Sequence, residues 1–321
     1  MTRPGIIIGS APSSGSTLLV TRLGRASNIY QTDELYIFDK PDWIAERHPG
    51  LQENWDKNFH RGYPAHFEHE SRLVFPYEKS APRLAEFNGT YAEFCVSYMN
   101  EKASENGCGR WIEKTPTNIF SLPLLSERLP DLRYIIIVRH PGAVLRSLSK
   151  RKFNPFIAAA RAYYPMLVAA NISERDNVHV LRYEDLTANP AGTLKQAFDF
   201  IGEPFDQDYL VHGGAAGEPY VPSWQFNPSM KIVERDDTQP AIGAEHAFHT
   251  ARFNANAYFL DYVGIERSFS FLQLCEVFGY DVTLDPTTAL SIKPRLKRID
   301  AYAKYVARSV QARRPIRKKW Q

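Results

Sequence analysis

Short runs of apolar residues alternate with helical patterns along the chain. The first run covers residues 6–8, and comparable runs occupy residues 132–138 and 178–183. A strand that is apolar at consecutive positions is typical of a parallel sheet covered on both faces. Helical spacing appears at residues 17–26, 90–103, 119–129, 156–170, 252–263 and 268–278. The alternation predicts an α/β fold, a single three-layer domain with a central, mostly parallel sheet flanked by helices.

Weaker signals add two strands and one well-marked helix. Residues 28–36 suggest a short strand with a turn, and residues 110–118 suggest a strand that runs into a loop, because Pro116 cannot continue a central strand. Asn189, followed by proline, is a typical helix start, and Gly202 is a typical helix end. Residues 205–244 are rich in Gly, Pro and Asp and remain unassigned.

The loop after the first strand is P-loop-like. A strand, a turn of small residues and a helix N-terminus direct free N–H groups and the positive end of the helix dipole to one point, which suits a phosphate. The residues expected to line this site are Ser13, Ser14, Gly15, Ser16 and Thr17. The loop is not a Walker A motif, because five residues separate its glycines and Ser16 stands in place of the lysine. A nucleoside triphosphate is therefore a poor fit. The alternative is a plain turn without a ligand.

A second anion site is expected after the apolar run at 132–138. Arg139 follows that run at the carboxyl end of the strand, where ligands of open α/β sheets bind. The proline and glycine at 141–142 start a helix that carries Ser147 about two turns later. Arginine and serine in this arrangement can hold one phosphate together. The alternative for Arg139 is a surface salt bridge.

The composition is that of an ordinary globular protein with a net charge of +3. No run approaches the ~20 apolar residues that a membrane helix needs, and the first residues contain no apolar signal region. We therefore expect a cytoplasmic protein. Cys95, Cys108 and Cys275 lack metal-ligand spacing, so we expect reduced structural cysteines and no metal site.

The domain is expected to span residues 1–292, with an insertion at 40–88 and a separate tail at 293–321. The insertion contains eight aromatic rings and four histidines without a clean period. It suits a lid or a wall of the acceptor site, since rings and imidazoles suit sugars. Packing of these rings into a core is the alternative.

The tail carries eleven Lys and Arg residues against one acidic residue. Apolar residues at helical spacing predict a basic amphipathic helix: Leu296, Ile299, Ala303, Val306 and Val310. Docking of this helix onto the domain is one interpretation, and contact with an anionic membrane or a polyanionic acceptor is the other. Nucleic acid is not expected, because no reading motif accompanies the charge.

Together these motifs resemble the sulfotransferases that use 3′-phosphoadenosine 5′-phosphosulfate (PAPS), and especially their bacterial and Golgi-type carbohydrate or protein branch. The matching segments are, in order, the 5′-phosphosulfate loop (12–19), the segment with the catalytic carboxylate (34–39), the Lys-Thr-Pro element (113–116) and the 3′-phosphate site (139–147). Residues 181–186 are a softer likeness. Each segment alone is weakly specific, whereas the ordered set is strong.

The resemblance implies PAPS as the sulfuryl donor, with no metal. It assigns Glu34 as the base for the acceptor proton and Lys114 as the cation nearest the bridging oxygen. Asp33 and His60 are rivals for the role of base. The alternatives outside catalysis are a capping or surface carboxylate for Glu34 and a solvated Lys114.

One position departs from the family pattern. The family usually has lysine or arginine where Ser13 stands, so Lys114, or Arg22 on the first helix, is expected to carry more of the electrostatic work. His140 replaces a common aspartate, and we attach no function to it.

The expected function is transfer of a sulfuryl group from PAPS to a hydroxyl or amine, with a carbohydrate as the favoured acceptor. Two alternatives remain: a P-loop kinase-like phosphotransferase, and a catalytically weak homologue that binds anions or glycans.

Overall fold

The computed structural model describes residues 3–32, 34–44, 83–84, 86–210, 242, 246, 249–250 and 257–282. Most of the insertion at 40–88, the whole tail at 293–321, Asp33 and His60 lie outside the described residues.

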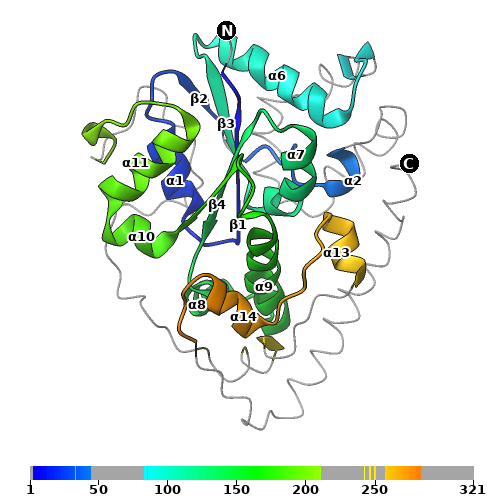
Figure 1. The fold of residues 1–321 in the computed structure, drawn as a ribbon, viewed down its shortest axis with the longest axis vertical. Helices are drawn as coiled ribbons and strands as arrows, with labels where there is room; N and C mark the ends of the chain where they lie inside the picture. The colour runs from blue at the N-terminus through cyan, green and yellow to red at the C-terminus, as the bar shows by residue number, and fades with distance from the viewer. Residues whose placement is uncertain are drawn as a thin grey trace.

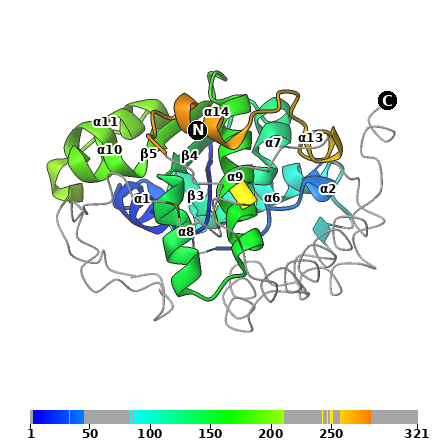
Figure 2. The same cartoon turned by 90° about the horizontal axis from the view of Figure 1, so that it is seen from below.

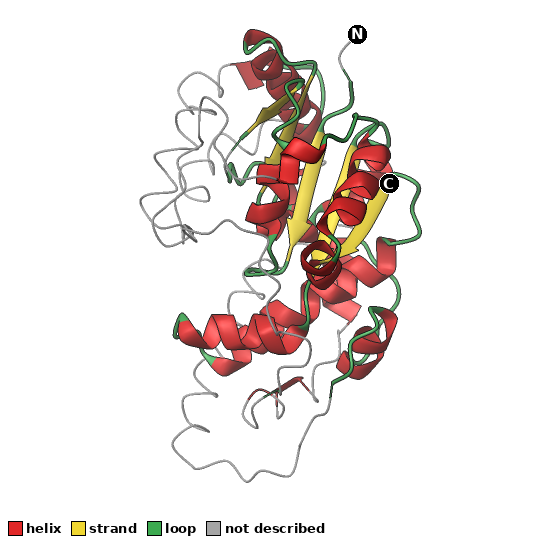
Figure 3. Cartoon of the chain, turned by 90° about the vertical axis from the view of Figure 1, so that its left-hand side faces the viewer, coloured by secondary structure: helices red, strands yellow, loops and turns green. Residues whose placement is uncertain are grey.

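A five-stranded sheet with the order β2-β3-β1-β4-β5 forms the centre of the protein. Every pairing in it is parallel, as the apolar runs predicted. Figure 3 shows the strands side by side between helices. The strands are β1 (Ile6–Ser10), β2 (Ile29–Gln31), β3 (Arg110–Lys114), β4 (Arg133–Val138) and β5 (Val178–Arg182).

Side chains alternate between two cores, one on each face of the sheet. Ile6 and Ile8 face one core, whereas Ile7 faces the other, and none of the three is exposed. Both faces are covered, so apolar residues are favoured at consecutive positions of a strand. This explains the continuous apolar runs in the sequence.

Among the helices of the described residues, three cover the face that receives Ile6 and Ile8, and the others pack on the opposite side (Figures 1 and 2). The first face carries α1 (Ser16–Leu23), α10 (Tyr183–Ala188) and α11 (Pro190–Ile201), with the 3₁₀ turn η3 (Gln207–Leu210) beside them. The core on the opposite side includes residues of α2 (Pro41–Ile44), α6 (Tyr91–Glu105), η2 (Pro116–Phe120), α7 (Leu122–Arg128), α8 (Pro141–Lys150), α9 (Pro155–Ile172), α13 (Ala257–Val263) and α14 (Phe271–Val277). No helix in the described part of the chain is long and apolar enough to span a membrane.

Local capping chemistry sets several boundaries. Thr90 and Glu93 form a reciprocal capping box at the start of α6. Gly202 ends α11 in the left-handed conformation, with φ 70°. The single helix expected at 119–129 is instead two elements, because proline at the start of η2 and again at the start of α7 begins a new turn each time.

The strand order creates a switch point between β1 and β4. From β1 the chain moves to β2 and β3 on one side, and it then crosses to β4 and β5 on the other side. The connections that leave β1 and β4 therefore diverge, and ligands of open α/β sheets bind in the crevice formed there.

Candidate active site

The loop at residues 11–15 follows β1 at this switch point, and its shape requires glycine. Gly15 has φ 89°, and a Cβ at this position would lie 2.3 Å from Cδ2 of Tyr183. Any other residue would meet both backbone strain and the aromatic ring. Gly15 directly precedes α1, whose first N–H groups have no acceptor within the helix.

A buried hydroxyl in the loop has no partner among the described residues. Ser14 is fully buried, and its Oγ makes no hydrogen bond there. Buried hydroxyl groups are normally paired, so an anion in the loop would give this one an acceptor. Ser16, buried in the first turn of α1, and the half-buried Thr17 complete the cradle. The phosphate site at these residues stays a prediction.

Arg139 reaches the loop from the end of β4. Its Nη1 donates a hydrogen bond to the carbonyl oxygen of Ser13 at 3.0 Å. Its guanidinium carbon lies 4.3 Å from the centre of the Tyr183 ring, in the range of a cation–π contact. Tyr183 thus packs against both Gly15 and Arg139. The softer likeness at 181–186 included this tyrosine but gave it no role.

Ser147 lies half-buried on α8, on the helix that begins just after Arg139. Arg151 follows it by four residues, one turn further along. The Arg151 Nη1 lies 3.5 Å from the Oγ of Ser13. Two guanidinium groups thus contact the residue that lacks the usual positive charge. Sequence reasoning missed Arg151, although its spacing from Ser147 was a usable signal.

The other candidate cation, Arg22, is placed differently. It lies in the last turn of α1 and is 2% exposed, about 9 Å along the helix axis from Ser16 at 1.5 Å per residue. Burial, followed by the charge of Arg25, lowers the pKa of its guanidinium. Arg139 and Arg151 are the cations whose contacts with Ser13 are described above.

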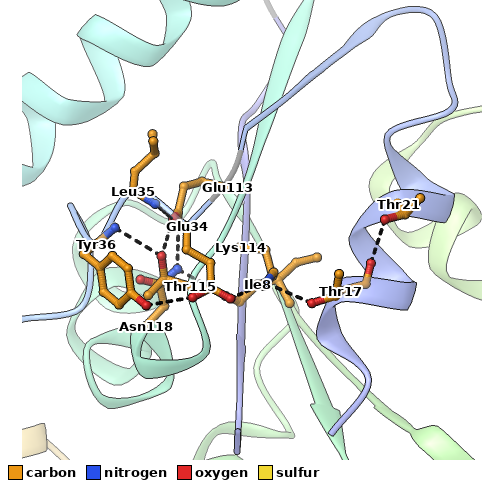
Figure 4. A network of polar contacts seen from close by, with 10 residues as sticks. All are labelled: Ile8, Thr17, Thr21, Glu34, Leu35, Tyr36, Glu113, Lys114, Thr115 and Asn118. Atoms are coloured by element: carbon orange, nitrogen blue, oxygen red, sulfur yellow. Dashed lines mark hydrogen bonds and ion pairs between the residues drawn. The ribbon is translucent and has the colours of Figure 1, made fainter. Parts of the chain in front are cut away.

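Lys114 and Glu34 form a buried ion pair beside the loop (Figure 4). The Lys114 Nζ lies 2.5 Å from Oε1 of Glu34 and 3.2 Å from Oγ1 of Thr17. The side chains of Lys114 and Glu34 are only 4% and 10% exposed. The hydroxyl of Tyr36 donates to the second carboxylate oxygen of Glu34 at 2.7 Å. The solvated lysine and the surface carboxylate, which were the alternatives, do not describe these residues.

Strand alternation separates Lys114 from the residue before it. Ile112 lies in the core beside α1, whereas Trp111 lies in the core on the opposite face. The side chain of Lys114 lies on the same face of the sheet as Ile112 and contacts Thr17 on α1. The side chain of Glu113 lies on the same face as Trp111 and contacts Asn118 on η2. The adjacent residues Glu113 and Lys114 therefore lie in two different environments.

Glu113 is fully buried and accepts three hydrogen bonds. Its Oε1 accepts from the backbone N–H of Leu35 at 3.1 Å and from Oγ1 of Thr115 at 2.5 Å. Its Oε2 accepts from Nδ2 of Asn118 at 2.5 Å. Burial raises the pKa of Glu113 to about 7, although these three hydrogen bonds and the charge of Lys114 oppose the rise. Sequence reasoning assigned no role to this residue.

His140 has a structural role at the start of α8. Its Nδ1 accepts a hydrogen bond from the N–H of Gly142 at 3.2 Å, and its own backbone N–H donates to Oε1 of Glu184 at 2.8 Å. The other oxygen of Glu184 accepts from the hydroxyl of Tyr280 at 3.1 Å. His140 thereby fixes the connection that carries Arg139.

Metal-binding signals are absent from the described residues. They contain no group of three or more His, Cys, Asp or Glu side chains able to hold a metal ion. Cys95, Cys108 and Cys275 are unpaired thiols.

Comparison with known proteins matches the sequence to one family. The sequence model described as "Sulfotransferase family" matches residues 4–207, a stretch that contains the loop, the ion pair and Arg139. The chain is 22% identical over 257 residues to protein-tyrosine sulfotransferase A of Caenorhabditis elegans. The match covers 74% of this chain and 58% of that relative, so the chain spans less than two thirds of its length.

Solved structures show the same fold. The sulfotransferase domain of the Synechococcus PCC 7002 olefin synthase is 20% identical with a TM-score of 0.55, and the match covers 88% of this chain and 98% of that domain. The sulfotransferase domain of the curacin biosynthetic pathway is also 20% identical, with a TM-score of 0.54 and coverage of 88% and 100%. The family match covers more than half of the chain, and the resemblance found in the motifs is confirmed: the chain belongs to the sulfotransferase family.

Proposed function

We propose that the protein transfers a sulfuryl group from PAPS to a hydroxyl or amine of an acceptor. The observation that carries the proposal is the buried ion pair of Lys114 and Glu34 beside the anion loop. The pair places a base and a cation together, and the cation is bonded to Thr17 of the anion cradle; a base and a cation are the two groups that sulfuryl transfer requires.

The donor fits the two groups of anion-binding residues. PAPS supplies an activated sulfuryl group on its 5′-phosphate and a separate 3′-phosphate. We assign the 5′ end to the cradle of Ser13, Ser14, Gly15, Ser16 and Thr17. The 3′-phosphate is assigned to Arg139 and Ser147, with Arg151 as a further cation near Ser13. The absence of a loop lysine disfavours the kinase-like alternative.

The residues then have defined tasks. Glu34 accepts the proton of the acceptor hydroxyl while the acceptor oxygen forms its bond to sulfur. The bond between sulfur and the bridging phosphate oxygen breaks, and Lys114 donates a hydrogen bond to that oxygen as it gains negative charge. Because Thr17 holds the Lys114 ammonium at 3.2 Å, the cation is fixed before the reaction begins. The loop N–H groups stabilise the remaining phosphate charge.

A carbohydrate is the first candidate acceptor. The aromatic residues and histidines of 40–88 support it by composition. A tyrosine hydroxyl in a peptide is the second candidate, and the name of the C. elegans relative supports it.

Cytoplasmic residence of the protein and contact of the tail 293–321 with anionic membranes are further proposals. Co-sedimentation with anionic vesicles, with and without the tail, tests the membrane contact.

The deciding experiment measures turnover of labelled PAPS by the full chain against panels of glycans, small hydroxylated molecules and tyrosine peptides. We expect turnover in at least one panel, a loss of at least a hundredfold in Glu34→Gln, and retained binding of 3′-phosphoadenosine 5′-phosphate (PAP) by that variant. Failure to bind PAP at millimolar concentrations would refute the proposal. Binding of ATP that depends on Mg²⁺ would favour the kinase-like alternative.

A further inference from the structure

The backbone around Glu34 is held by side chains that do not contact the Glu34 carboxylate. The N–H of Leu35 donates to Oε1 of Glu113 at 3.1 Å. The N–H of Tyr36 donates to Oγ1 of Thr115 at 3.2 Å. Consecutive backbone groups directly after Glu34 are thus fixed from the end of β3 (Figure 4).

These contacts hold an unusual backbone conformation. Tyr36 has φ 57°, in the left-handed region that bulky residues rarely adopt. This conformation allows the side chain to turn back, so that its hydroxyl donates to Glu34. A left-handed residue of this kind persists only where its surroundings hold it. The bond from its own N–H to Thr115 is one such restraint.

The anchor of this arrangement is Glu113. Thr115 donates its hydroxyl hydrogen to Glu113, so the same threonine oxygen is oriented to accept from Tyr36. Asn118 secures the far oxygen of Glu113 and also donates to the carbonyl oxygen of Ile8 at 3.1 Å. The turn that carries Glu34 is thereby connected to β1, the strand that ends at the anion loop.

We propose that Glu113 and Thr115 are positioning residues that set the Glu34 carboxylate against Lys114, an inference that rests on the proposed role of Glu34 as the base. Both side chains are completely buried, and they act through the backbone of Leu35 and Tyr36. A carboxylate suits this anchor because each of its contacts is an accepted hydrogen bond, which an amide cannot reproduce in full.

The primary variant is Thr115→Val, which keeps the shape and removes the hydroxyl that joins Glu113 to Tyr36. We expect kcat to fall about tenfold, since small displacements of a catalytic group are costly, while the affinity for PAP stays within twofold. Thr115→Ser should restore most of the activity. Glu113→Gln is the second variant, and we expect it to show the same fall in kcat with retained PAP affinity.

Thr193→Val is the matched control. Thr193 is also a buried threonine, on α11 and away from Glu34, and its hydroxyl donates to the carbonyl oxygen of Asp185 at 3.0 Å. The variant loses a buried hydroxyl and its hydrogen bond, as Thr115→Val does, but it should show no fall in kcat. An equal fall in kcat in Thr193→Val and Thr115→Val would overturn the inference.

A double-mutant cycle with Glu34→Gln separates the assignment of Glu34 as the base from the positioning role of Glu113 and Thr115. If Thr115 acts only through Glu34, Thr115→Val causes no further loss of kcat in the Glu34→Gln background. A further tenfold loss there would contradict the positioning role. If Glu34→Gln alone leaves turnover unchanged, the base assignment and this inference both fail. If Glu34→Gln lowers kcat but Thr115→Val and Glu113→Gln do not, only this inference fails.

Discussion

The ammonium group of Lys114 contacts the carboxylate of Glu34 at 2.5 Å, although the residues lie 80 positions apart in the chain. The sheet brings them together, because β2 and β3 pair in parallel with Gln31 opposite Ile112. Continuing this register places the segment after β2 beside the end of β3. The pair therefore depends on strand register rather than on any local sequence feature.

Lys114→Met should destabilise the fold. It leaves the nearly buried Glu34 carboxylate without its cation, and breaking a buried ion pair typically costs about 3–5 kcal/mol. The free energy of unfolding from urea titration should fall by about 3 kcal/mol on that scale. The loss of stability in the double variant Lys114→Met/Glu34→Gln should be smaller than the sum of the losses in the single variants, because both charges are removed and no unpaired charge is left buried. Additive effects would show that the two residues are energetically independent.

The same lysine should dominate the chemical step. Removing one donor aimed at developing charge typically lowers kcat about 10²–10³-fold, and we expect Lys114→Met to fall in that range, measured by single-turnover kinetics on folded protein. Lys195→Met is the control, because Lys195 forms an exposed pair with Asp199 on α11. Equal loss in both variants would contradict the assignment.

Arg139→Ala should weaken nucleotide binding. Hydrogen bonds to charged groups contribute about 1.5–3 kcal/mol, so the Kd for PAP should rise by roughly 10- to 150-fold, as measured by calorimetry. The Kd for PAP should also depend less steeply on salt concentration, since one charge contact is lost. Lys150→Ala, at the exposed end of α8, is the control and should leave the Kd unchanged. An unchanged Kd in Arg139→Ala would remove Arg139 from the nucleotide site.

The sheet and the loop could be predicted from the sequence because their signals are local. Continuous apolar runs identify strands covered on both faces, and glycine with small polar residues after β1 identifies the loop. Gly15 and Arg139 were found in this way. The family resemblance added the roles of Glu34 and Lys114, but their contact in an ion pair was not predicted.

Other features of the site depend on three-dimensional contacts. The contact of Arg151 with Ser13 joins positions 138 apart. The separate environments of Glu113 and Lys114 follow from which face of β3 each side chain occupies, and a continuous apolar strand pattern does not reveal that choice. The left-handed conformation of Tyr36 is accompanied by its bond to Thr115 and is not indicated by its residue type.

Gly15→Ala should abolish nucleotide binding through a collision rather than through strain alone. A left-handed backbone costs a non-glycine residue about 1–2 kcal/mol wherever it occurs. Gly107 is a matched control, because it has φ 70° and a Cβ there would meet nothing within 4 Å. Both alanine variants should lose similar stability from the backbone, but only Gly15→Ala displaces Tyr183 and loses PAP affinity. Loss of affinity in Gly107→Ala would point to a global effect.

Glu113 should make stability depend on pH in a defined direction. Burial raises its pKa in the folded protein to about 7, above the ordinary value of 4.5. Between these values the folded state binds more protons than the unfolded state, so the contribution of this group falls as pH rises. It is fully present below pH 4.5 and is lost as the pH passes 7. Glu113→Gln does not titrate, so the stability difference between wild type and this variant isolates the effect. The free energy of unfolding of the wild type, measured relative to that of Glu113→Gln in denaturant titrations, should fall by on the order of 3 kcal/mol between pH 4.5 and 7.5. A difference that is constant or grows over this range would show that the hydrogen bonds from Leu35, Thr115 and Asn118 keep Glu113 ionised despite its burial.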